Sequence, residues 1–162
     1  MAIELGIKGS SSCTVTSDLT AKSLRSGGLD VLATPIMVAL MEEAALLSVR
    51  PYLEPGTDTV GTRLDVSHLS ATPVGMKVRA ESTLVEIDRR RLVFEVKAYD
   101  EAGLIGEGTH ERFVVDMEKF TAKCEAKKAK LARKREPPPK GAAVFLAFAG
   151  FTNCSRIYRA LF

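Results

Sequence analysis

The residues best suited to chemistry are a pair of glutamates inside an apolar segment. Glu42 and Glu43 interrupt the apolar sequence between Ile36 and Val49. Burying a carboxylate costs several kcal/mol unless a partner or a shifted pKa compensates, so at least one of them needs a reason to be there. An exposed edge that carries two solvated glutamates is the structural alternative. Helical spacing alone does not decide between Glu42 and Glu43.

A histidine and a threonine are the other candidates. His68 ends an alternating segment and precedes the loop Leu69 to Gly75, where it could exchange a proton near neutral pH. A hydrogen-bonded structural histidine fits the same position. Thr34 precedes Pro35 and is explained equally well as the cap of a helix. None of these residues identifies a site by itself.

The elements that would position them follow from periodicity and from the turn residues. A strand is predicted from Ser11 to Leu19 and a helix from Thr34 to about Val49, apolar on nearly every side and therefore buried. Turns are expected at Asp88 to Arg91 and at Asp100 to Gly103. Four alternating segments predict further strands: Thr59 to Ser67, Lys77 to Ile87, Leu92 to Tyr99 and Ile105 to Asp116. An antiparallel sheet around one central helix is an α+β fold.

Composition limits the class of protein. The 162 residues suit one main domain, and the start of the chain lacks the pattern of a secretory signal, so a cytoplasmic location is expected. Cys13, Cys124 and Cys154 have neither disulfide nor zinc spacing. With only two histidines, no metal site is expected.

The end of the chain differs from the rest in charge. Basic residues number 12 and acidic residues 18 through Glu118, whereas Lys119 onward has 11 and 2. The domain is therefore predicted to span 1–123, and 124–162 to be a basic, proline-containing, partly disordered tail with a helical stretch. Its apolar run, 142–151, has no assigned partner. Such charge runs are more often solvated than functional, so no nucleic-acid partner is expected and membrane contact by the tail is the less favoured alternative.

Three stretches of the sequence resemble one enzyme family. GLDVLATPIMVALMEEAA, PYLEPGTDTVGTRLDVSHLSATPVGM and GLIGEGTHERFVVD are similar to the hotdog thioesterases related to fluoroacetyl-CoA thioesterase, over nearly all of 10–123. The predicted sheet and central helix suit that fold. The family's threonine, glutamate and histidine correspond to Thr34, Glu42 and His68, so the resemblance selects Glu42 over Glu43.

The resemblance also implies residues near the substrate. The family's glycine and arginine correspond to Gly61 and Arg112. Leu32 stands where the fluoroacetyl-specific enzyme has an aromatic lid, which argues against the same specificity. Coenzyme A phosphates would need a basic rim, for which the candidates are Lys77, Arg89, Arg90 and Arg91, although a solvated hairpin explains the three arginines as well.

The resemblance implies hydrolysis of a small acyl-CoA by a homodimer or a higher oligomer, with Glu42 and His68 drawn from different subunits. Glu42 would activate water or attack the acyl carbon, His68 would transfer the proton, and Thr34 would orient Glu42 or the water. Amides at the start of the helix would hold the oxyanion. No cofactor is implied, because coenzyme A belongs to the substrate. A non-catalytic acyl-CoA binding or sensing module is the alternative, and a hydratase ranks third.

Overall fold

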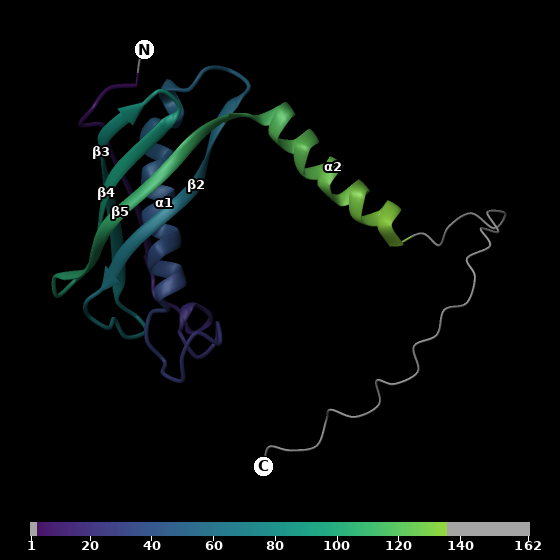
Figure 1. Cartoon of the computed structure of the whole chain (residues 1–162). Helices are drawn as coiled ribbons and strands as arrows, with labels where there is room; N and C mark the ends of the chain where they lie inside the picture. Colours follow the sequence, from purple (N-terminus) through teal and green to yellow (C-terminus); the bar gives the residue numbers. More distant parts are fainter. Residues whose placement is uncertain (1–2, 136–162) are drawn as a thin grey trace, which may run out of the picture. The chain divides into compact units, whose positions relative to one another are not determined.

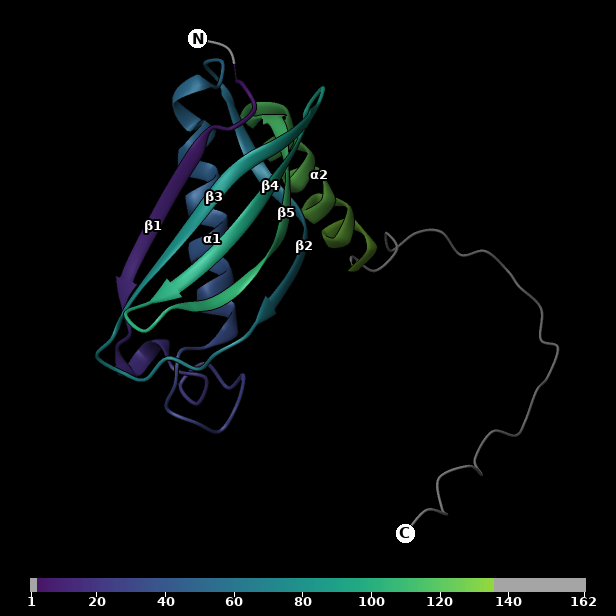
Figure 2. The ribbon, with the colours of Figure 1, turned by 90° about the vertical axis from the view of Figure 1, so that its left-hand side faces the viewer.

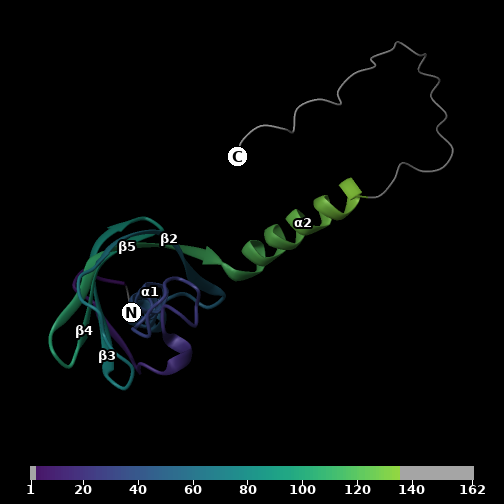
Figure 3. The same cartoon turned by 90° about the horizontal axis from the view of Figure 1, so that it is seen from below.

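The computed structural model describes residues 3–135 of the chain. It divides into two units, Met1–Glu125 and Ala126–Phe162. The first unit contains a five-stranded antiparallel sheet and the helix α1 (Thr34–Val49), and the sheet curls around that helix (Figures 1 and 3). The α+β arrangement predicted from the sequence is thus confirmed.

The strands lie in the order β1-β3-β4-β5-β2, so β1 and β2 form the two edges. Figure 2 shows α1 behind the sheet and along its strands. The bounds of the strands are β1 (Lys8–Thr14), β2 (Thr57–His68), β3 (Lys77–Asp88), β4 (Arg91–Asp100) and β5 (Leu104–Asp116). Short 3-10 helices, η1 (Ser17–Leu19) and η2 (Arg50–Tyr52), follow β1 and α1.

The predicted helix has the bounds that the structure shows, and the four later strands agree within two residues at each end. The first strand is different: it begins at Lys8 and ends at Thr14, so the prediction of Ser11 to Leu19 is wrong at both ends. The exposed face of this edge strand carries mostly serine and threonine, which gives little hydrophobic alternation to mark its start. Ser17–Leu19 form η1 instead.

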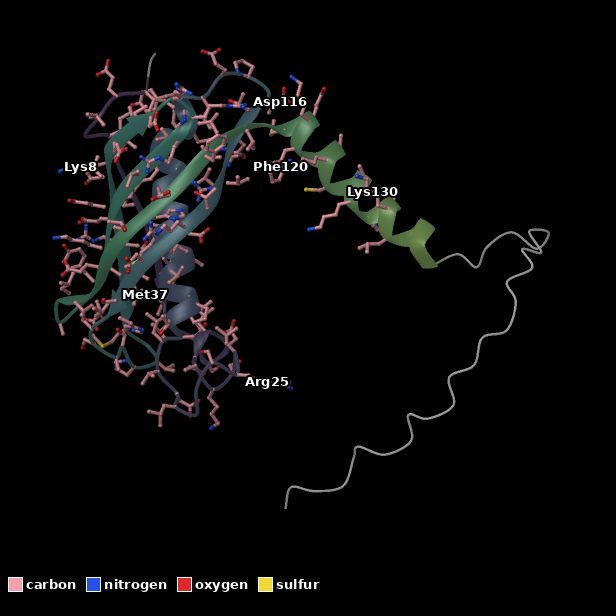
Figure 4. The ribbon with its side chains drawn as sticks, viewed as in Figure 1. Lys8, Arg25, Met37, Asp116, Phe120 and Lys130 are labelled. Atoms are coloured by element: carbon pink, nitrogen blue, oxygen red, sulfur yellow. The ribbon has the colours of Figure 1, made fainter. Side chains whose placement is uncertain are left out.

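The core lies between α1 and the concave face of the sheet. Met37 and Phe94 are fully buried there, and Met37 belongs to the first turn of α1 (Figure 4). Gly9 lets β1 approach the helix closely, because a Cβ at this position would lie 2.1 Å from the carbonyl oxygen of Ala44. The sheet covers only one side of α1, since Leu47 is 44% exposed. The prediction of a helix buried on nearly every side therefore does not hold for the single chain.

The helix α2 (Met117–Arg135) begins where β5 ends. It includes residues 124–135 of the predicted tail, and 136–162, with the apolar run 142–151, lie outside the described residues. None of the helices within 3–135 is long and apolar enough to cross a membrane. Over the same range, no three His, Cys, Asp or Glu side chains are grouped so that they could hold a metal ion.

Candidate active site

Thr34 and His68 meet where α1 begins and β2 ends. The Thr34 hydroxyl lies 2.8 Å from His68 Nδ1. Thr34 is the first helical residue and Ala33 is the N-cap, with no side-chain capping bond. The alternative explanation of Thr34 as the helix cap therefore does not hold, and its hydroxyl contacts His68 instead. Both residues line a cavity of about 330 Å³, together with Ala21, Ser26, Val31, Leu32 and residues 69–71.

The second ring nitrogen of His68, Nε2, has a different environment. Within the described residues, Nε2 is buried and makes no hydrogen bond. A buried, unpaired polar atom costs about 1–3 kcal/mol, so a native structure usually supplies a partner from a ligand, from water or from another chain. The described residues therefore leave His68 Nε2 without the partner that a buried ring nitrogen normally has.

Glu42 lies two turns along α1 from Thr34, about 12 Å at 1.5 Å per residue. One of its carboxylate oxygens lies 3.9 Å from Nη1 of Arg112, and its side chain is 38% exposed. Gly61 on β2 faces it, because a Cβ on Gly61 would lie 3.4 Å from Glu42 Oε2. The structure thus brings Glu42, Gly61 and Arg112 together, but it places Glu42 apart from Thr34 and His68 within one chain.

Glu43 has a separate environment. Its carboxylate accepts a hydrogen bond from the Ser11 hydroxyl on β1. Together with Glu42 and Arg112 it lines an open cavity of about 570 Å³, whose other walls are apolar except for a cysteine: Cys13, Leu19, Ile36, Ala39, Leu40 and Leu46. Burial and the charge of Glu43 raise the pKa of the Cys13 thiol, which disfavours a thiolate nucleophile there.

Arg112 is held on several sides. Its Nε and Nη2 donate to the hydroxyl and carbonyl oxygens of Thr59, each at 2.8 Å, and Nη1 donates to the carbonyl oxygen of Glu42 at 3.4 Å. Burial lowers the pKa of Arg112, and the charges of Glu42 and Asp58 act against this. The guanidinium is nevertheless a fixed cation, because arginine stays protonated in proteins. It therefore provides a positive charge beside the Glu42 carboxylate.

Sequence reasoning missed His110. This side chain has no exposed surface and lies 3.2 Å from Arg112 through its Nε2. The only signal available was a second histidine two residues before the candidate arginine in the alternating sequence of β5, which places both side chains on one face of the sheet. That signal indicates a shared face and nothing about a role.

The remaining candidates are distributed between the two ends of the sheet. Leu32 is 2% exposed, lines the cavity of Thr34 and His68, and is tied to the loop after β2 through its amide, which donates to the Thr72 carbonyl oxygen at 2.8 Å. Lys77 begins β3, whereas Arg89, Arg90 and Arg91 lie beyond its other end. Lys77 and the three arginines therefore lie at opposite ends of β3 within one chain.

The three arginines differ in their contacts. Arg91 forms ion pairs with Glu86, Asp88 and Glu111, and Arg90 stacks on the ring of Phe113 at 5.7 Å. Arg89 has φ 54° in the tight turn and forms no ion pair within the described residues. Phe113, the partner of Arg91 on β5, is seven residues from Gly106, the partner of His68. The arginines are thus about 23 Å along the sheet from His68 of the same chain.

Comparisons with known proteins identify the family. The model of fluoroacetyl-CoA-specific thioesterases, FlK, matches residues 15–118. The fluoroacetyl-CoA thioesterase of Streptantibioticus cattleyicolor is 46% identical over 98 residues, which are 60% of this chain and 70% of that protein.

Solved structures agree with this match. A mutant of FlK in complex with acetyl-CoA aligns with TM-score 0.73 and 37% identity, over 77% of this chain and 98% of that chain. A thioesterase superfamily member from Thermus thermophilus aligns with TM-score 0.76 and 29% identity, over 81% of this chain and 97% of that chain. The chain therefore belongs to the family of fluoroacetyl-CoA-specific thioesterases, has the hotdog fold and is a thioester hydrolase.

Proposed function

We propose that the protein hydrolyses a small acyl-CoA to the free acid and coenzyme A, at a site shared between two copies of the chain. The observation that carries this proposal is the division of the polar residues. Thr34 and His68 form one half, in which His68 Nε2 has no partner among the described residues. Glu42, Gly61 and Arg112 form the other half. The first half contains the histidine that can transfer a proton, and the second contains the carboxylate that can activate water.

The edge strand β2 supports a dimer. It is twelve residues long, its residues 61–65 are exposed, and only β5 pairs with it within the described residues. An unpaired edge of this length is a template for another strand. Antiparallel pairing of two copies of β2 about a two-fold axis at Asp65, with Thr62 as the bulge residue, would set His68 of one copy opposite Gly61 of the other, and therefore beside that copy's Glu42.

The exposed side of α1 supports the same assembly. Ile36, Ala39 and Leu46 line the open cavity beside Glu42 and Glu43, and Leu47 on this helix is 44% exposed. A helix that is apolar on nearly every side needs a second cover. The second copy of the chain would supply it while the edges pair.

The basic rim also gains a position in this dimer. Arg91 and Val60 both pair with Phe113 of β5, so Arg91 lies at the same level along the strands as Val60, which is next to Gly61. Antiparallel pairing would bring Arg91 and Arg89 of one copy to the same end of the joined sheet as His68 and Lys77 of the other copy. The arginine hairpin and Lys77 could then face one coenzyme A from different chains.

The chemistry follows from these positions. The Glu42 carboxylate, oriented by Arg112, takes a proton from water that attacks the thioester carbonyl, or attacks that carbon itself to form an anhydride that water then opens. His68, held through Nδ1 by Thr34, delivers a proton from Nε2 to the departing thiolate. The first turn of α1 offers few oxyanion donors: Pro35 has no N–H, and the amides of Ile36 and Met37 donate to the Ala33 carbonyl oxygen. The Thr34 amide is the one that remains.

The test is thiol release from a panel of acetyl, longer acyl, aromatic and fluorinated acyl-CoAs. Glu42→Gln and His68→Asn should each lower kcat by about 100-fold or more, the usual size of an acid–base contribution. Glu43→Gln is the matched control, because it differs by one position and its carboxylate bonds Ser11 instead. Unchanged rates in both Glu42→Gln and His68→Asn would contradict the proposal. Tight binding of the panel without thiol release by the wild type would favour a non-catalytic binding module.

A further inference from the structure

His110 is a buried titratable residue that the chemistry above does not use. It lies on β5 between Leu64 of β2 and Phe94 of β4, with no exposed surface, and its ring centroid is 6.5 Å from that of Phe94. An imidazole without solvent contact must satisfy both nitrogens from the protein, or it destabilises the fold. Both nitrogens of His110 have partners.

The partners determine which nitrogen carries the proton. Nδ1 lies 3.0 Å from the carbonyl oxygen of Arg63 on β2, and Nε2 lies 3.2 Å from Nη1 of Arg112. A carbonyl oxygen can only accept a hydrogen bond, and a guanidinium can only donate one. The neutral ring with hydrogen on Nδ1 is the form that satisfies both contacts. The form with hydrogen on Nε2 and the doubly protonated cation each place a donor against the donor of Arg112.

The bond to His110 acts on the nitrogen of Arg112 that faces Glu42. Nε and Nη2 are fixed by Thr59, whereas Nη1 lies between His110 Nε2 at 3.2 Å and Glu42 Oε2 at 3.9 Å. Gly61 leaves just enough room for this arrangement, because a Cβ there would lie 3.1 Å from His110 Cε1. The imidazole therefore contacts the one guanidinium nitrogen that lies nearest the Glu42 carboxylate and that Thr59 does not bind.

We propose that His110 is a positioning residue for thioester hydrolysis: as a neutral imidazole protonated on Nδ1, it orients Arg112 and through it the carboxylate of Glu42. This inference rests on the proposed role of Glu42. His110 touches neither the substrate nor the reacting atoms, so it acts only through Arg112. Its effect is expected in kcat more than in KM.

The surroundings of His110 keep the ring neutral. The charged groups that face it are Arg112 and Glu111 from β5 and Glu42 from α1, while β2 contributes the Arg63 carbonyl and β4 the uncharged ring of Phe94. Burial lowers the pKa of His110, and so does the charge of Arg112; the hydrogen bond to Arg63 and the charges of Glu42 and Glu111 act in the opposite direction without prevailing. Near neutral pH the ring can therefore keep accepting from Arg112.

The first test is nitrogen NMR of the full chain labelled with ¹⁵N-histidine. The chain has two histidines, so a His68→Asn spectrum assigns the signals of His110. We expect protonated Nδ1 and unprotonated Nε2 at pH 7, with no titration near the ordinary histidine pKa of about 6.5. A ring protonated on Nε2, or one that titrates at the ordinary value, would overturn the inference. This result does not depend on any substrate.

The second test is a pair of substitutions that keep different halves of the ring. The amide of His110→Asn starts at the position of Nδ1 and can still donate to Arg63, but it does not reach Arg112. The amide of His110→Gln reaches the position of Nε2 and offers Arg112 an acceptor. We expect kcat to fall about tenfold in His110→Asn, as for the loss of one hydrogen bond, and to recover most of the loss in His110→Gln, with little change in KM.

Equal rates in the two variants, or a loss confined to KM, would overturn the positioning role. Failure of the proposed function gives a different pattern, in which Glu42→Gln keeps its rate while the NMR signals of His110 still report the Nδ1 form. The two ideas are therefore tested separately.

Discussion

The Thr34 hydroxyl and His68 Nδ1 lie 2.8 Å apart although 34 residues separate them in the sequence. Thr34 is available for this contact because Ala33 takes the N-cap position and no side chain caps the helix. The start of α1 and the end of β2 thus hold one histidine nitrogen, while the other, Nε2, is buried without a hydrogen-bond partner among the described residues.

Removing the Thr34 hydroxyl should impair His68. Thr34→Val keeps the shape of the side chain but leaves Nδ1 without its partner, so we expect kcat to fall by about tenfold or more. Thr34→Ser, which keeps the hydroxyl, should retain most of the rate. The measurement is kcat from steady-state thiol release. Equal kcat values in Thr34→Val and Thr34→Ser would show that the hydroxyl is not needed.

Gly61→Ala should impair the other half of the site. Its Cβ would lie 3.1 Å from His110 Cε1, so that ring must shift by a few tenths of an ångström, and it would touch Glu42 Oε2 at 3.4 Å. We expect a clear fall in kcat, because reacting groups lose rate steeply when they are displaced. Gly28→Ala is the control for stability, since its Cβ meets nothing within 4 Å. A wild-type rate in Gly61→Ala would contradict close packing around Glu42.

Thr72→Val should destabilise the fold. The buried Thr72 hydroxyl donates to the Asp100 carboxylate at 2.8 Å. Burial opposes ionisation of Asp100, but this bond and the amides of Ala102 and Gly103 prevail and lower its pKa. The loss should be about 1–3 kcal/mol in urea unfolding at pH 7. Because the folded pKa is depressed, this stabilisation is present above about pH 3.9 and disappears as pH falls through the folded pKa. A deficit that persists in acid would contradict the assignment.

His110 should make the protein sensitive to mild acid. Its pKa is lowered in the folded state, so below the ordinary value of about 6.5 the unfolded chain binds the additional proton. Stability linked to His110 is therefore full above that pH and is lost as pH falls toward the folded pKa. Urea unfolding from pH 7.5 to 5 should show the wild type losing its advantage over His110→Gln, whereas a constant difference would mean that the folded pKa is not lowered. His68 is present in both proteins, so its contribution cancels in the difference.

The sequence predicts most of the fold because the later strands alternate cleanly and proline fixes the start of α1. The early strand was misplaced, since the serines of β1 give no hydrophobic alternation, and its close packing on α1 depends on Gly9, which no local pattern reveals. Periodicity likewise could not choose between Glu42 and Glu43. Their difference depends on contacts with remote strands, Arg112 on β5 for one and Ser11 on β1 for the other.

The pairing of Thr34 with His68 and the role of His110 could not be read from the residues alone. Thr34 has a complete local explanation as a cap, and only the structure shows that Ala33 takes that position. The protonation form of the His110 ring depends on the Arg63 carbonyl of β2 and on the Arg112 guanidinium two residues away. The register of the sheet brings both groups to the ring.

The most direct measurement is the activity of a mixture of two inactive proteins. Glu42→Gln and His68→Asn are combined and allowed to exchange subunits. If each site takes His68 from one chain and Glu42 from the other, a hybrid dimer has one site with both lesions and one with neither. Random exchange should then restore about a quarter of wild-type thiol release, because half of the dimers are hybrids with one intact site.

Mixing His68→Asn with Thr34→Val is the matched control. Both lesions lie in the same half, so a hybrid dimer has one damaged residue in each site and no activity should return beyond that of the parents. Recovery with Glu42→Gln but not with Thr34→Val is the result that a shared thioesterase site predicts. No recovery in either mixture after complete subunit exchange would contradict it.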